Sequence, residues 1–140
     1  MLVFEALMKA SSLGLVVSVN LRSASELLSK VKLWAEAAKQ ASKGKLDYSA
    51  AADKVVFSNG ARVLSLPATS DSLRGFTCNT ICAIDEAAFC PNLEEILQAI
   101  SPTLSRTPSA QLVLTSTPAG KNGEFYKLWE NAQNDNAWYT

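Results

Sequence analysis

The stretch TICAIDEAAF, residues 80–89, places a short apolar run directly before two adjacent carboxylates, Asp85 and Glu86. An uninterrupted apolar run of this length is typical of a strand that is buried on both faces, as in a parallel sheet flanked by helices. Open α/β sheets bind their ligands beyond the carboxyl ends of their strands. We therefore predict that both acids lie at the ligand-binding edge of such a sheet.

Two acids at the end of a buried strand suit a site for a magnesium–nucleotide complex. Asp85 would hold Mg²⁺, through water, and Glu86 would polarise the water that attacks the γ-phosphate of ATP. This is the Walker B pattern of an NTPase whose second acid is catalytic. The alternative interpretation is that the two acids are solvated residues that open a loop or a helix.

Length and composition indicate a single domain, residues 1–140, that is large enough to bury a core. The formal net charge is zero, which gives no overall argument for binding nucleic acid or a membrane, although a local basic patch is compatible with it. No apolar run approaches the roughly 20 residues that span a bilayer. Residues 1–5 contain an early acid and no basic segment, unlike a secretory signal. We therefore expect a cytoplasmic protein.

The chain contains three cysteines and no histidine. The lack of histidine excludes His-based catalytic triads and His-containing zinc sites. The spacing of Cys78, Cys82 and Cys90 does not match a CxxC zinc or redox motif, and three thiols cannot all pair within one chain. We interpret them as structural thiols in a reducing cytoplasm.

Helical and strand patterns alternate along the chain, which predicts an α/β fold with a mainly parallel sheet and right-handed crossovers. The expected helices are 1–12, 24–42, 92–101 and 124–132, and the expected strands are 14–20, 54–58, 62–66, 80–84 and 110–116. Asn59-Gly60 predicts a hairpin between the second and third strands. Residues 45–53 and 68–79 are expected to be loops, and residues 138–140 to begin a further strand.

The long helix is expected to start at an N-cap, Ser23, with Glu26 completing a capping box. Its apolar stripe comprises Leu27, Leu28, Val31, Trp34, Ala35 and Ala38. Lysines on the opposite face are interpreted as solvated, with DNA contact as the alternative. A second expected cap, Asn92, begins the helix that Pro102 is expected to end.

Two further polar features accompany the acids. The expected strand 110–116 ends in three hydroxyl residues, Thr115, Ser116 and Thr117, which would sense the γ-phosphate and report hydrolysis; alternatively, they satisfy backbone groups at the strand end. Arg74, in the loop before the central strand, would approach a phosphate or pair with an acid; alternatively, it is a surface arginine.

A phosphate loop of the form G-x-x-x-x-G-K-[ST] does not occur in the 140 residues. The chain begins with an expected helix and then a strand, the elements that normally follow that loop. We therefore expect a nucleotide-binding sheet that is truncated at its N-terminus and lacks its first strand and phosphate loop.

Five segments of the chain occur in an order that resembles the large terminase subunit of tailed bacteriophages, the motor that packages DNA into proheads. They resemble, in turn, the second strand with its helix, the hairpin, the approach to Walker B, Walker B itself and the coupling motif. The segments are Leu15-Val16-Val17-Ser18 with Ala24, Glu26 and Leu27; Asn59-Gly60-Ala61-Arg62; Ser72-Leu73-Arg74-Gly75; Ile84-Asp85-Glu86-Ala87-Ala88-Phe89; and Thr115-Ser116-Thr117-Pro118 with Gly120, Gly123, Phe125 and Tyr126. The resemblance spans about Leu2 to Trp129.

The resemblance implies a P-loop NTPase core of the ASCE, RecA-like kind that hydrolyses ATP with Mg²⁺. It implies a ring on the portal protein of the prohead, translocation of double-stranded DNA and a small terminase subunit as partner, with no role for a membrane. By position, Asp85 would coordinate Mg²⁺ and Glu86 would be the catalytic acid. Thr115, Ser116 and Thr117 would be the coupling residues, with Arg74 as a further candidate.

In that family, the adenine-contacting segment and Walker A would lie before Met1, and the nuclease domain would follow Thr140. We therefore interpret the chain as a partial ATPase domain, either an engineered fragment or the product of a decayed prophage gene. Without Walker A, Asp85 and Glu86 are not expected to hydrolyse ATP usefully. The missing central strand would leave a sheet edge or groove exposed, which predicts a homo-oligomer, an exchanged element or a shifted N-terminal helix.

Three alternatives belong to other classes. A helicase-like ASCE ATPase fragment would share the Asp-Glu strand, but the Phe-Tyr-x-Leu-Trp segment at 125–129 favours a terminase. A non-enzymatic prophage remnant would bind no ATP. A two-acid metal nuclease would need further acids around the site, and Glu94 and Glu95 are better interpreted as acids in the first turn of a helix.

Overall fold

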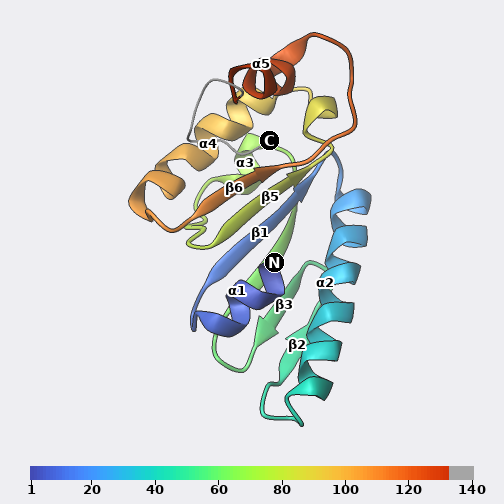
Figure 1. Cartoon of the computed structure of the whole chain (residues 1–140), viewed down its shortest axis with the longest axis vertical. Helices are drawn as coiled ribbons and strands as arrows, with labels where there is room; N and C mark the ends of the chain where they lie inside the picture. The colour runs from blue at the N-terminus through green and yellow to red at the C-terminus, as the bar shows by residue number, and fades with distance from the viewer. Residues whose placement is uncertain (133–140) are drawn as a thin grey trace.

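Four parallel strands form most of the sheet in the computed structural model, which describes residues 1–132 (Figure 1). The six strands have the order β2-β3-β4-β1-β5-β6. In chain order the elements are α1 (Leu2–Met8), β1 (Leu13–Ser18), α2 (Leu21–Ala41), β2 (Tyr48–Ala50), β3 (Lys54–Phe57), β4 (Arg62–Pro67), α3 (Ser70–Leu73), β5 (Ile81–Asp85), the 3₁₀ turn η1 (Ala87–Phe89), α4 (Leu93–Arg106), β6 (Gln111–Leu114) and α5 (Gly123–Ala132). The predicted mainly parallel α/β fold is confirmed.

The two strands predicted to be buried, β1 and β5, lie side by side in the sheet. All six residues of β1 are buried, and β1 pairs in parallel with β4 and β5. In β5, Ile81, Cys82 and Ile84 are at most 2% exposed. A strand covered on both faces has no solvent side, so its sequence shows a continuous apolar run rather than an alternating one.

Side chains of alternating direction fill one hydrophobic core on each face of the sheet. Leu15, Val17 and Ile84 pack on the face covered by α4, where Ile96 and Ile100 are buried. On the other face α1 and α2 cover β1, β3 and β4, and the core there contains Ala6, Val16, Leu28, Ala35, Val55 and Val63. Figure 1 shows α2 on one side of the sheet and α4 on the other.

The long helix α2 begins earlier than its sequence predicted. Asn20, in an extended conformation, is the N-cap, and its side-chain oxygen accepts a hydrogen bond from the backbone N–H of Ser23 at 2.9 Å. The prediction that Ser23 is the N-cap is therefore wrong, because an asparagine three residues earlier already satisfies that N–H.

The buried stripe of α2 is narrower than predicted. The buried positions are Ala24, Leu28, Val31 and Ala35, at helical spacing. Trp34, placed in the predicted stripe, is 69% exposed, because it lies to one side of the line of contact with the sheet. Two small alanines, Ala24 and Ala35, flank Leu28 and Val31 along this line.

The predicted hairpin is confirmed, and three short elements, β2, α3 and η1, were not predicted. β3 and β4 pair as antiparallel strands around Gly60, whose φ of 82° is the left-handed conformation that an Asn-Gly turn requires. β2 adds a strand within the expected loop 45–53. α3 forms within the expected loop 68–79, where the hydroxyl of Thr69 accepts from the N–H of Ser72 at 3.2 Å.

Other boundaries also differ from the predictions. α4 does not end before Pro102 but continues to Arg106, because its last turn is held by tertiary contacts. There the Thr103 hydroxyl donates to the carbonyl of Phe76 at 3.0 Å and Leu104 packs on the core. α1 ends at Met8 instead of residue 12. The strand expected at 138–140 lies outside the described residues. No helix within residues 1–132 is long and apolar enough to cross a membrane.

Candidate functional site

The parallel register aligns the carboxyl ends of neighbouring strands. Ser18 at the end of β1 is the register partner of both Pro67 of β4 and Asp85 of β5. Ile84 partners Leu114 of β6, so Thr115 directly follows β6 beside Asp85. The acids thus lie at the sheet edge that the sequence predicted, and the hydroxyl residues after β6 lie next to them.

A hydrogen bond joins the two strand ends. The hydroxyl of Thr115 donates to Oδ1 of Asp85 at 2.7 Å, while the backbone N–H of Thr115 donates to the carbonyl of Ile84 at 2.9 Å. The backbone bond fixes Thr115 in the sheet ladder, so its hydroxyl is held beside the carboxylate. Hydrogen bonds to charged acceptors are among the stronger ones. The contact therefore restricts the orientation of Asp85, whose second oxygen accepts no hydrogen bond from residues 1–132.

Glu86 has an unusual backbone conformation directly after β5. Its φ of 53° and ψ of 38° are left-handed, which is disfavoured for a residue with a side chain. The chain then turns into η1, whose first two N–H groups bond to the residues after β6. Ala87 donates to the carbonyl of Thr115 at 3.0 Å, and Ala88 donates to the hydroxyl of Ser116 at 3.1 Å. The Glu86 side chain is exposed, so its carboxylate faces solvent.

The sequence did not predict this conformation of Glu86. A glycine or asparagine at this position would have signalled a left-handed backbone, but a glutamate followed by two alanines gives no such signal. The hydroxyl residues after β6 were predicted as a polar cluster near the acids, and the structure brings Thr115 and Ser116 into contact with that segment. Thr117 contributes its backbone carbonyl, which accepts from the Ser116 hydroxyl at 2.9 Å.

A buried thiol lies behind the acid pair. Sγ of Cys90 is 3.8 Å from the carbonyl of Glu86. Burial raises the pKa of the Cys90 thiol, and the charges of Glu86 and Asp85 raise it further, so the thiol stays protonated at neutral pH. Burial also raises the pKa of Cys78 and Cys82. All three cysteines are free and buried, as predicted for structural thiols.

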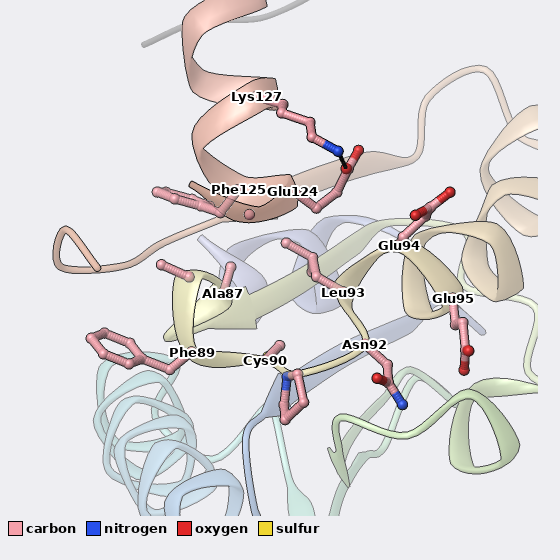
Figure 2. A pocket seen from close by; sticks show the side chains of 13 residues that line it. Ala87, Phe89, Cys90, Asn92, Leu93, Glu94, Glu95, Glu124, Phe125 and Lys127 are labelled. Atoms are coloured by element: carbon pink, nitrogen blue, oxygen red, sulfur yellow. Dashed lines mark hydrogen bonds and ion pairs between the residues drawn. The ribbon is translucent and has the colours of Figure 1, made fainter. Parts of the chain in front are cut away.

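Two hollows adjoin the acid pair. An apolar groove of about 670 Å³ opens between α1 and α2, and Asp85 and Thr115 line it together with Phe4, Val16, Trp34 and Ala83. A second pocket, of about 420 Å³, is formed by η1 and the first turns of α4 and α5 (Figure 2). Glu94, Glu95 and Glu124 line this second pocket, and Glu124 pairs with Lys127 at 3.3 Å. Figure 2 shows η1 as its floor beside the start of α4.

Arg74 is not brought to the acids by a contact. It caps the end of α3 and is exposed, and it forms no ion pair with any residue in the part of the chain that the structure describes. Its predicted approach to a phosphate therefore stays a prediction.

The oxygen-bearing side chains at the ends of β5 and β6 fit a magnesium site that has few protein ligands. Among residues 1–132, no group of three or more His, Cys, Asp or Glu side chains lies close enough together to hold a metal ion. Asp85 offers one carboxylate, and Thr115 orients it. Mg²⁺ is commonly bound by one or two carboxylates and completes its shell with waters and substrate phosphates. The residues present fit this mode of binding.

Comparison with known proteins identifies relatives of this fold. The family model described as terminase large subunit, T4likevirus-type, N-terminal, matches residues 6–139. A mutant of the ATPase domain of the large terminase of Thermus phage P74-26 has a TM-score of 0.74 at 22% identity, covering 86% of this chain and 53% of that one. This chain thus spans about half the length of that domain.

A large terminase from a thermophilic bacteriophage is also similar in structure. One crystal form has a TM-score of 0.74 at 12% identity, covering 94% of this chain and 33% of that one. Another crystal form of that large terminase, in complex with ADP, has a TM-score of 0.67 at 15% identity. The match covers 90% of this chain and 31% of that one. At such low sequence identities, the structural matches show only that the fold is shared, and this fold is the P-loop NTPase fold.

Proposed function

The chain belongs to the family of terminase large subunits, and on that premise we propose that it forms part of the ATP-hydrolysing motor that packages viral DNA into proheads. The observation that carries the proposal is the 2.7 Å hydrogen bond from Thr115 to Asp85 across the ends of β5 and β6, with Glu86 next in the chain. It joins the predicted Walker B acid to the predicted coupling segment on the fold that terminase ATPase domains share.

Asp85 and Glu86 have separate roles in this proposal. Asp85, oriented by Thr115, holds the hydrated metal ion of the nucleotide. Glu86 is exposed at the start of η1, where its carboxylate orients and polarises the attacking water. Bound Mg²⁺ would neutralise charge that develops on the phosphates. Glu95, in the first turn of α4, is given no part in this chemistry.

Nucleotide binding needs groups beyond those of the 140 residues. A related large terminase has been solved with ADP, which supports a nucleotide as the ligand. No stretch of this sequence matches a phosphate loop. We therefore propose that the 140 residues alone hydrolyse ATP poorly, because positioning and charge stabilisation are nearly all of phosphoryl-transfer catalysis.

The free side of β6 offers a place for the missing groups. Within residues 1–132, β6 pairs only with β5. Its outer edge therefore has unpaired N–H and C=O groups one strand away from Asp85. A strand that pairs there would deliver a phosphate loop at its carboxyl end, beside Thr115 and the acids.

The partners proposed for the motor follow from the family. They are double-stranded DNA, the portal protein, the small terminase subunit and further copies of the chain in a ring. Because the net charge is zero, binding to DNA would depend on local basic residues rather than on the overall charge.

Calorimetric titration with Mg-ADP and with a slowly hydrolysed Mg-ATP analogue tests this proposal. We compare the 140-residue chain with the same chain joined at its N-terminus to the strand and phosphate loop of a terminase large subunit. The joined protein is expected to bind both nucleotides with micromolar affinity, and Asp85→Asn should weaken binding in the presence of Mg²⁺. Asp53→Asn, in the turn before β3, is the matched control.

Two results would contradict the proposal. Micromolar binding by the 140-residue chain alone would show that the phosphate loop is not needed. A joined protein that folds but binds no nucleotide would show that the acids of this chain no longer form an ATPase site, as expected for a non-enzymatic remnant.

A further inference from the structure

The residues after β6 hold the segment after β5 by two different kinds of contact. The carbonyl of Thr115 accepts from Ala87 through the backbone alone, a bond that any residue at 115 would make. The hydroxyl of Ser116 accepts from the N–H of Ala88 at 3.1 Å, a bond that needs this side chain. Only the second contact therefore depends on the sequence after β6.

The hydroxyl of Ser116 is also used as a donor. It donates to the carbonyl of Thr117 at 2.9 Å, so its hydrogen points away from Ala88 and its lone pairs face the Ala88 N–H. A hydroxyl has one hydrogen and two lone pairs, and both functions are satisfied at once. Ser116 is half-buried, which limits competition from water for these bonds.

The segment held in this way contains the left-handed residue Glu86. Left-handed backbone costs free energy for a residue with a side chain and persists only where its surroundings determine it. Glu86 immediately precedes the two N–H groups that are bound, and its own carbonyl accepts from Phe89 at 2.9 Å to close the 3₁₀ turn. Losing the Ala88 contact would loosen this turn and allow Glu86 to relax toward an extended or right-handed conformation.

We propose that Ser116 is a positioning residue that holds Glu86 in its left-handed conformation through the N–H of Ala88. The proposal deepens the proposed function, because it gives Ser116 a role toward the acid that orients the attacking water. It also makes the conformation of the segment after β6 a determinant of where the Glu86 carboxylate points. Thr115 acts on the neighbouring acid, Asp85, so adjacent residues after β6 control the two acids separately.

Nuclear magnetic resonance of the 140-residue chain, without nucleotide, tests this role. Two readouts are measured: the hydrogen-exchange rate of the Ala88 amide, and the φ of Glu86 from its three-bond N–H to Hα coupling and carbon chemical shifts. Ser116→Ala is compared with Ser116→Thr, which keeps the hydroxyl, and with Thr117→Ala, whose hydroxyl is not in the contact. Amides of β1 report whether the whole protein has been destabilised.

In the wild-type chain and in Ser116→Thr we expect a protected Ala88 amide and a left-handed Glu86. Ser116→Ala is expected to speed exchange at Ala88 by roughly fivefold or more, the factor that corresponds to one lost hydrogen bond. It should also shift the φ of Glu86 away from the left-handed region, with β1 unchanged. A merely structural role for Ser116 would change exchange throughout the chain and leave the φ of Glu86 as it was.

The proposal is overturned if Ser116→Ala keeps the φ of Glu86, or if the wild-type chain itself shows an unprotected Ala88 amide or an extended Glu86. Either of these two wild-type results overturns the proposal even if Ser116→Ala does not fold. Because neither readout needs ATP, a failure of nucleotide binding would count against the proposed function and leave the role of Ser116 to be decided by these spectra.

Discussion

Replacing Thr115 with valine should remove a specific interaction with Asp85 while keeping the shape of the side chain. The 2.7 Å bond from the Thr115 hydroxyl to Asp85 is a hydrogen bond to a charged acceptor. Such bonds contribute about 1.5–3 kcal/mol when they are shielded from water. Thr115 is exposed and Asp85 is half-buried, so screening by water reduces the expected interaction energy to about 1 kcal/mol.

A double-mutant cycle isolates this energy. The free energy of unfolding is measured by urea denaturation for the wild type, Thr115→Val, Asp85→Ala and the double variant. The interaction energy should be about 1 kcal/mol, which corresponds to about 0.5 M in the urea midpoint for a chain of this size. A matched cycle with Thr117→Val in place of Thr115→Val should give a value near zero. An interaction energy below about 0.3 kcal/mol for the Thr115 pair would refute the claim that Thr115 orients Asp85.

Further predictions concern the core, the cap of α2 and a surface ion pair. Ile96→Ala should lower the free energy of unfolding by about 2–5 kcal/mol in urea denaturation, because Ile96 is fully buried between α4 and the sheet; a loss below about 1 kcal/mol would contradict the described core. Asn20→Ala should cost about 1 kcal/mol, whereas Ser23→Ala should stay within about 0.5 kcal/mol; the reverse order would restore Ser23 as the cap. Lys39 lies 2.8 Å from Asp47, and its hydrogen bond and charge lower the pKa of Asp47. The pair's contribution to stability is therefore present above the unfolded-state pKa of Asp47 and is lost as the pH falls below about 4. Lys39→Met should raise the Asp47 pKa, measured from its carboxyl carbon shift, toward but not fully to the ordinary value, because the N–H of Tyr48 still donates to the Asp47 carboxylate at 2.9 Å; an unchanged pKa would contradict the ion pair.

The fold class was predictable because its evidence is spread over the whole chain. The continuous apolar runs of β1 and β5 require burial on both faces, and the Asn59-Gly60 turn fixes the antiparallel addition to the sheet. Strand ends in a parallel sheet meet at one edge, so the sequence placed Asp85 and Thr115 at the same edge, and the pairing of β5 with β6 in the structure makes them neighbours. These features depend on hydrophobic pattern and topology, which sequence shows directly.

The missed features depend on contacts between distant residues. α4 continues past Pro102 because Thr103 bonds to the carbonyl of Phe76, which lies in a loop on the other side of β5 in the sequence. The left-handed Glu86 is held by N–H groups that bond to the residues after β6. The helix and strand propensities of a local segment do not indicate such partners, because tertiary structure supplies them.

The hydrophobic pattern of α2 also led to a wrong prediction, that Trp34 lies in the buried stripe. A tryptophan at helical spacing from other apolar residues is usually counted as buried, yet Trp34 is exposed beside the apolar groove. The helix contacts the sheet along a line through Ala24 and Ala35. Leu28 and Val31 are buried in the same stripe, so position on the helix relative to this line, rather than hydrophobicity alone, set which side chains are buried.

The central claim is that Glu86 is the catalytic acid of an ATPase site in this chain. The most direct test is the steady-state rate of ATP hydrolysis by the chain joined to a terminase strand and phosphate loop. Glu86→Gln keeps the size and hydrogen-bonding capacity of the side chain, and Glu95→Gln in α4 is the control. We predict that Glu86→Gln lowers kcat by about 10²- to 10⁴-fold, the contribution of a positioned general base, with the affinity for Mg-ATP unchanged and Glu95→Gln active. Equal rates for Glu86→Gln and the joined protein without substitution would contradict the account.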